Sequence, residues 1–162
     1  MEENIETGIG SFIKRKLITT FATMLVFSII LASYGLLQDT SGEVYKPGNK
    51  FFQWVIIFLF YIGVVVLIYG NIVSIGIEFL QNKFFKKHDW LYVVILGIFG
   101  LANGLFFQER MFALYGMLAA LLYAIVDKWL IKRFSESKSS VAFIILPIVL
   151  LFLMWGFFNF IY

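Results

Sequence analysis

The chain of 162 residues is 61% hydrophobic and only 14% charged, whereas soluble proteins are roughly 45–50% apolar and about 25% charged. Its length fits one domain, and a soluble domain of this size could not bury so much apolar surface. Cysteine is absent, which excludes disulfides, cysteine-ligated zinc, iron–sulfur clusters and thiol nucleophiles. The composition predicts a single integral membrane domain.

Five apolar segments are long enough, or nearly so, to cross a bilayer as helices. About 20 helical residues span ~30 Å of hydrocarbon while bonding every backbone polar group internally. The predicted spans are 17–37, 51–80, 90–107, 111–131 and 141–162. The second exceeds one bilayer thickness, which favours tilt or extension into the interface. We therefore expect an all-α polytopic bundle of about five spans.

The connections between these spans are short and polar. Residues 38–50 include Pro47 and Gly48, which break helices, and residues 108–110 predict a tight antiparallel hairpin between the third and fourth spans. Pro147 lies within the last span, where its missing backbone donor predicts a kink.

The N-terminal stretch has alternative interpretations. Three basic residues before residue 17 resemble the n-region of a signal peptide, but an apolar run over 17–37 is longer than a typical h-region and lacks a small-x-small cleavage site. An uncleaved first span is therefore the preferred interpretation. Apolar residues at helical spacing before it predict either a short interfacial helix, which Gly8 and Gly10 would weaken, or a disordered lead-in.

The basic residues predict the orientation, because cytoplasmic loops collect lysine and arginine. On one side of the five-span arrangement lie Lys14, Arg15, Lys16, Lys83, Lys86, Lys87, Lys128, Lys132, Arg133 and Lys138. The opposite side holds Lys46, Lys50 and Arg110. The N-terminus is thus expected in the cytoplasm and the C-terminus outside. These clusters flank apolar runs, so the net charge of +3 predicts no nucleic-acid partner.

Polar residues inside predicted spans form one candidate site. Asn71, Ser74 and Glu78 are spaced by three and four residues and share a helical face, and Asp127 lies at a similar inner depth of the fourth span. They could line a water-filled vestibule or cation site for transport. The preferred interpretation is that the two carboxylates reach the headgroup region and pair with Lys83, Lys128 or Lys132, while Asn71 makes one interhelical hydrogen bond.

Small residues form stripes that predict close helix packing, because lipid gives no hydrophobic drive for helix association. The stripe residues are Gly63, Gly70, Gly97, Gly100, Gly104, Gly116 and Ala120. The predicted hairpin favours packing of the third helix on the fourth within one chain over a homodimer face.

Enzyme signatures are missing from the sequence. It contains no HExxH, no GxSxG and no Walker phosphate loop, and its lone histidine, His88, has no second ligand nearby in sequence. We expect no enzymatic activity, no cofactor and no metal.

These observations favour a small multi-pass protein of the cell membrane with a structural, accessory or interaction role. Its expected partners are the lipid bilayer and another membrane protein or a second copy of itself. The alternative is a subunit of a small-solute or ion transporter or channel that uses the inner-leaflet polar residues.

Overall fold

The computed structural model describes residues 2–39, 46–84, 89–108, 110–135 and 139–160. Every regular element in these ranges is helical. In chain order the elements are α1 (Glu2–Leu37), α2 (Pro47–Val65), the π-helical turn η1 (Val66–Gly70), α3 (Asn71–Phe84), α4 (Asp89–Phe107), α5 (Arg110–Ser135) and α6 (Ala142–Phe160). Each predicted span lies within these helices except at the two ends of the fifth, where residue 141 forms a turn and residues 161–162 lie outside the described residues.

The structure confirms a helical membrane bundle of about five spans. Within the described residues, four helical segments are long and apolar enough to cross a membrane: Gly10–Leu37, Pro47–Gln81, Arg110–Arg133 and Ala142–Phe160. The segment Trp90–Leu105 is apolar but shorter. The chain is therefore a multi-pass membrane protein.

The first helix is longer than the sequence predicted. It runs without interruption for 36 residues from Glu2 to Leu37, so the disordered lead-in is wrong for residues 2–16, and the helix expected there is continuous with the first span. Gly8 and Gly10 each cost only about 1 kcal/mol relative to alanine in a helix interior, and α1 contains no proline. The helix therefore continues past both glycines.

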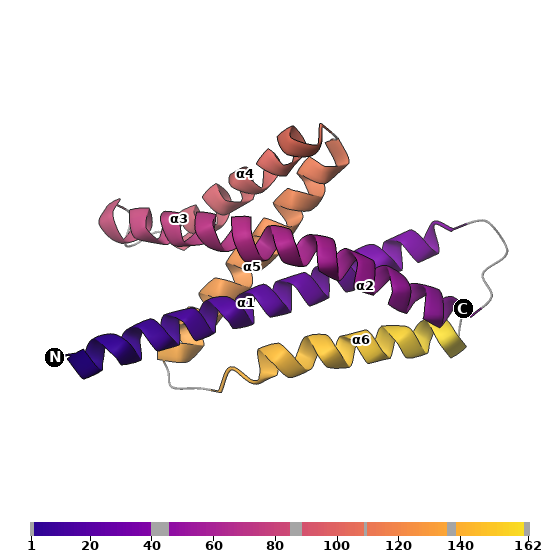
Figure 1. The fold of residues 1–162 in the computed structure, drawn as a ribbon, viewed down its shortest axis with the longest axis horizontal. Coiled ribbons are helices and arrows are strands. Elements are labelled where there is room, and N and C mark those ends of the chain that lie inside the picture. Colours follow the sequence, from indigo (N-terminus) through magenta and orange to yellow (C-terminus); the bar gives the residue numbers. More distant parts are fainter. Residues whose placement is uncertain (1, 40–45, 85–88, 109, 136–138, 161–162) are drawn as a thin grey trace.

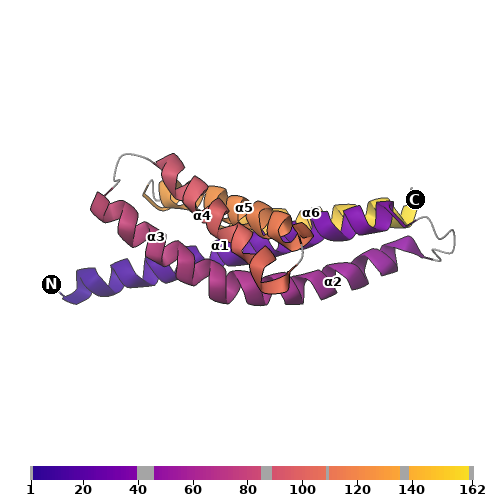
Figure 2. The same ribbon diagram turned by 90° about the horizontal axis from the view of Figure 1, so that it is seen from above.

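The long helices α1, α2 and α6 run together along the longest axis of the molecule, and the α4–α5 hairpin leaves them obliquely (Figure 1). Helix α1 is central, since it packs against α2, α5 and α6. The two ends of the chain lie at opposite ends of the long axis in both views (Figure 2). This arrangement is the one that an odd number of spans requires.

Two apolar cores hold the bundle together. The first joins α1, α2 and α6 and contains Leu25, Ile29, Ala32, Leu36, Phe51, Val55 and Phe158. The second joins η1, α3, α4 and α5 and contains Val66, Ile77, Tyr92, Leu96, Tyr123 and Ala124. The hairpin thus packs on a different part of the bundle from α6.

Glycines bring α4 and α5 into close contact. A Cβ atom added at Gly100 would lie 2.5 Å from the carbonyl oxygen of Gly116, and one at Gly104 would lie 2.4 Å from the Cβ of Ala113. Gly97 faces Leu121. Backbones this close leave no room for larger side chains, so this stripe packs inside the hairpin.

The other two predicted stripe residues do not make such contacts. A Cβ at Gly63 would meet only Met24 Sδ at 3.5 Å, and one at Gly70 would meet Val66 of its own π turn at 3.4 Å. These are ordinary van der Waals distances. The spacing of small residues in the second span therefore marks no tight helix crossing.

The orientation gives a first testable prediction, because the chain offers no native cysteine to a thiol reagent. Gln38→Cys and Ser139→Cys lie at exposed positions on opposite sides of the predicted membrane. We expect a membrane-impermeant maleimide to label Gln38→Cys in intact cells and Ser139→Cys only after the membranes are opened. The reverse pattern would invert the orientation.

Candidate functional site

The middle of α1 carries a polar face that is buried inside the bundle. Its members repeat at intervals that keep them on one side of a helix. They are Arg15, Lys16, Thr19, Thr20 and Thr23, each 5% exposed or less. Buried cations are rare unless they are paired, so this face requires acidic partners on the neighbouring helices.

Lys16 pairs with Asp127, which is fully buried on α5. The Lys16 ammonium lies 2.7 Å from Asp127 Oδ2 and 3.0 Å from Glu78 Oε2, and it donates to Ser74 Oγ at 2.5 Å. All three donor positions of the ammonium thus face an acceptor. One side chain ties α1 to both α3 and α5.

Arg15 pairs with Glu78 of α3 through a single nitrogen. Its Nη2 donates to Oε1 at 2.7 Å and to Oε2 at 2.9 Å. Its Nη1 lies 3.4 Å from Asp127 Oδ1 but makes no hydrogen bond. We call Arg15, Lys16, Glu78 and Asp127 the charge cluster; it contains two cations and two carboxylates and is neutral overall.

Hydroxyl groups complete the hydrogen bonding of Asp127. Tyr92 of α4 donates to Asp127 Oδ2 at 2.7 Å, and its oxygen lies 2.6 Å from Ser74 Oγ. Thr19 donates to its own helix at the Arg15 carbonyl, 3.0 Å away, and lies 3.4 Å from Asp127 Oδ1. Since Lys16 comes from α1 and Tyr92 from α4, three helices meet at the Asp127 carboxylate.

Asn71 forms a second polar contact, next to the π turn. Its Oδ1 accepts from Tyr123 of α5 at 2.6 Å, and its Nδ2 donates to Thr20 of α1 at 2.9 Å and to the Leu67 carbonyl at 2.9 Å. The Asn71 backbone N–H reaches back five residues to the Val66 carbonyl, which is the pairing of a π turn. The extra residue of this turn rotates α3 relative to α2 and so sets the direction of Asn71.

The charge cluster differs from the sequence prediction in the source of its cations. Asn71, Ser74, Glu78 and Asp127 do lie in one region, but the ion pairs of Glu78 and Asp127 run to α1, whereas Lys83, Lys128 or Lys132 were expected. Lys128 donates instead to Gln81 at 2.8 Å. Asn71 forms hydrogen bonds to two neighbouring helices, α1 and α5, whereas one interhelical hydrogen bond was expected.

Sequence reasoning missed the α1 residues and Tyr92. Arg15 and Lys16 were interpreted only as topology signals, although the threonines that follow at helical spacing extend the same polar face. That stripe of threonines was the available signal. Nothing in the sequence distinguishes Tyr92 from the other tyrosines of an apolar span.

The charge cluster is a network that is largely buried from solvent. Its charged side chains are mostly buried: Asp127 is 0%, Lys16 6%, Arg15 7% and Glu78 19% exposed. Among the described residues, no group of three or more histidine, aspartate or glutamate side chains could hold a metal ion. His88 lies outside the described residues.

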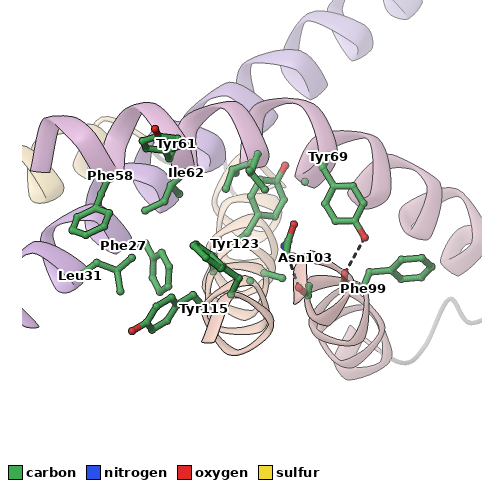
Figure 3. A pocket seen from close by; sticks show the side chains of 18 of the residues that line it. Phe27, Leu31, Phe58, Tyr61, Ile62, Tyr69, Phe99, Asn103, Tyr115 and Tyr123 are labelled. Atoms are coloured by element: carbon green, nitrogen blue, oxygen red, sulfur yellow. Dashed lines mark hydrogen bonds between the residues drawn. The ribbon is translucent and has the colours of Figure 1, made fainter. Parts of the chain in front are cut away.

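A large apolar cavity of about 580 Å³ lies beside this network. It forms where the α4–α5 hairpin diverges from α1 and α2, and it is partly open. Figure 3 shows aromatic rings from α1, α2 and α5 pointing into it, with Tyr123 among them. The hydrogen bond from Tyr69 to the Phe99 carbonyl, 2.8 Å long, crosses from the π turn to α4 at its edge. We call this space the main cavity.

A smaller inner cavity of about 290 Å³ lies between α3 and α4. It shares Val73 and Phe99 with the main cavity. Its other lining residues are Gly76, Ile77, Leu80, Gln81, Leu91, Tyr92 and Ile95. Both cavities are lined almost entirely by carbon, in contrast to the charge cluster beside them.

Comparisons with known proteins give no relative: no family model matches the chain, and neither a curated protein nor a solved structure matches it.

Proposed function

We propose that the chain is a non-enzymatic accessory protein of the cell membrane that acts by binding another membrane protein. The observation that carries this proposal is the closed charge cluster. Its four charged side chains bond one another and neighbouring hydroxyl groups across α1, α3, α4 and α5. A network of this kind fixes helices in one arrangement.

The cavities support the same proposal. A path for ions or small polar solutes needs polar groups along its wall, whereas the main and inner cavities are lined by apolar and aromatic side chains. Their chemistry suits hydrocarbon and not a hydrated solute. The polar residues of the spans serve to hold the helices together.

A transporter or channel subunit is the second candidate function. Ionisable side chains within spans commonly mark ion or proton pathways, and Glu78 is the most exposed member of the charge cluster at 19%. In this case water would reach Asn71 and Glu78 from the cytoplasmic side.

Cysteine accessibility distinguishes the two functions. We expect Asn71→Cys to stay unreactive toward a small hydrophilic maleimide in opened membranes, because the side chain lies between Thr20 and Tyr123. Ser139→Cys is the reactive control, and Ala124→Cys, at a position that is 0% exposed, is the unreactive control. Labelling of Asn71→Cys at a rate near that of Ser139→Cys would favour transport.

The accessory function also predicts a stable partner. Photo-crosslinking groups at Leu146 and Leu153, which are 66% and 65% exposed on α6, should join the chain to one defined membrane protein in native membranes. Crosslinks to lipid alone at both positions would contradict the proposal for this face.

A further inference from the structure

The inner cavity extends along α3 toward the end of the bundle that carries basic residues. Its last lining residue on α3 is Gln81, and the exposed Lys83 follows two residues later. Lys128 reaches the same place from α5: its ammonium donates to Gln81 and lies 4.7 Å from the centre of the Tyr92 ring. Gln81 and Tyr92 both line the cavity.

From these observations we propose that the inner cavity binds one hydrocarbon chain of an anionic phospholipid, with the lipid phosphate beside Lys83 and Lys128. Basic residues at the cytoplasmic mouth of a space between spanning helices are a known arrangement for acidic lipid headgroups. The end of the bound chain passes Val73 and Phe99 into the main cavity.

The dimensions fit a lipid chain. Gln81 and Gly70 are eleven residues apart, which is about 16 Å along a helix. That length is close to half of the ~30 Å hydrocarbon core, so a chain whose headgroup lies at Lys83 ends near the π turn. On α3 the inner cavity lines this path from Gln81 to Val73, and the main cavity continues it to Gly70.

The dimensions do not fit a protein helix. A helix with its side chains is about 10–12 Å across, so each turn of ~5.4 Å occupies roughly 500 Å³. The inner cavity, at about 290 Å³, is smaller than one such turn. A partner helix could therefore lie against the outside of the bundle but could not be enclosed within this space.

The charge at the mouth supplies the selectivity. Lipid tails around the protein are as apolar as the cavity wall, so packing alone gives little preference for a bound chain over a free one. The phosphate of an anionic lipid is attracted to the two ammonium groups. In a zwitterionic lipid the positive charge of the headgroup weakens this attraction. Binding is therefore expected to favour anionic over zwitterionic lipid.

Gly76 gives a direct test, because it lines the inner cavity and has no atom within 4 Å of an added Cβ. The Cβ of a leucine at this position meets no neighbour, and we expect the rest of its side chain to fill the cavity. Gly156 on α6 is the matched control: it also has no atom within 4 Å and lines neither cavity.

The experiment releases the full chain from nanodiscs of equal parts phosphatidylglycerol and phosphatidylcholine and counts retained lipids by native mass spectrometry. We expect one phosphatidylglycerol per chain in the original protein and in Gly156→Leu, and at least a fivefold lower retained fraction in Gly76→Leu. Lys83→Gln should lower the preference for phosphatidylglycerol severalfold, whereas Lys132→Gln, farther along α5, should not.

Three results would overturn the lipid site. They are equal retention of both lipids by the original protein, equal loss in Gly76→Leu and Gly156→Leu, or a lipid-free complex containing a second polypeptide. The proposal does not depend on the accessory function, since lipid retention and partner crosslinking are measured separately and either can fail alone.

Discussion

Asp127→Ala is expected to lower the free energy of unfolding by about 3–5 kcal/mol, because removal of one member of a buried ion pair leaves the other charge unpaired. Lys16 would retain only Glu78 as a carboxylate partner, at 3.0 Å. Tyr92 would lose the carboxylate to which it donates. Unfolding in a mild detergent with increasing dodecyl sulfate, followed by circular dichroism, measures the change.

A surface pair provides the control for this experiment. Asp39 and Lys50 form an ion pair whose side chains are 22% and 35% exposed, and exposed pairs typically contribute about 0–1 kcal/mol. Asp39→Ala should therefore shift stability far less than Asp127→Ala. A similar shift for both would mean that the charge cluster does not hold the helices together.

A double variant separates charge burial from packing. Replacing a buried ion pair with apolar residues of similar volume is often neutral or stabilising, so Lys16→Met combined with Asp127→Leu should recover much of the stability lost in Asp127→Ala. Ser74 and Tyr92 can still bond each other at 2.6 Å. Failure to recover would indicate that the polar contacts, and not charge balance, stabilise this region.

Gly100→Ala is expected to destabilise the α4–α5 hairpin by about 1–3 kcal/mol, the usual cost of inserting atoms into a packed interior. The new Cβ would lie 2.5 Å from the Gly116 carbonyl oxygen and 2.8 Å from the Ala120 Cβ. The obstruction is partly backbone, which cannot rotate away as a side-chain end can. The two helices must therefore separate.

Gly156→Ala is the matched control for this substitution. It removes a glycine from a helix of similar length where nothing lies within 4 Å of the new atom, and alanine is the better helix former by about 1 kcal/mol. Its stability should be unchanged or higher. Thermal unfolding of both variants in the same detergent tests the difference, and equal behaviour would contradict the close packing of α4 on α5.

The helices were predictable because each apolar run must satisfy its own backbone in lipid. That single requirement locates every span to within a few residues, including the short segment that became α4. It does not determine where a helix ends outside the hydrocarbon. Residues 2–16 of α1 are polar enough to allow several conformations, and their continuation of the helix depends on propensity and on packing of Arg15 and Lys16 against other helices.

The partners within the candidate site were less predictable. Helical spacing showed that Asn71, Ser74 and Glu78 share a face, but not which helix that face contacts. The π turn immediately before Asn71 adds one residue to the helical turn and so changes the direction in which this face points. Nothing in the sequence of Val66–Gly70 predicts a π turn. Arg15 and Lys16 both indicate the orientation and form buried ion pairs. Because the orientation already explains basic residues at this position, these two residues alone provided no reason to expect the ion pairs.

The charge cluster also constrains how the chain assembles during synthesis. Lys16 and Asp127 are 111 residues apart in sequence. At a synthesis rate of about 5–20 residues per second, Asp127 is therefore added to the chain roughly 5–20 s after Lys16. Until Glu78 of α3 follows, 63 residues after Arg15, the two cations of α1 face lipid phosphates or water. Insertion of α1 and its docking are therefore separate events, and a nascent chain that stops before α5 would expose this helix to membrane quality control.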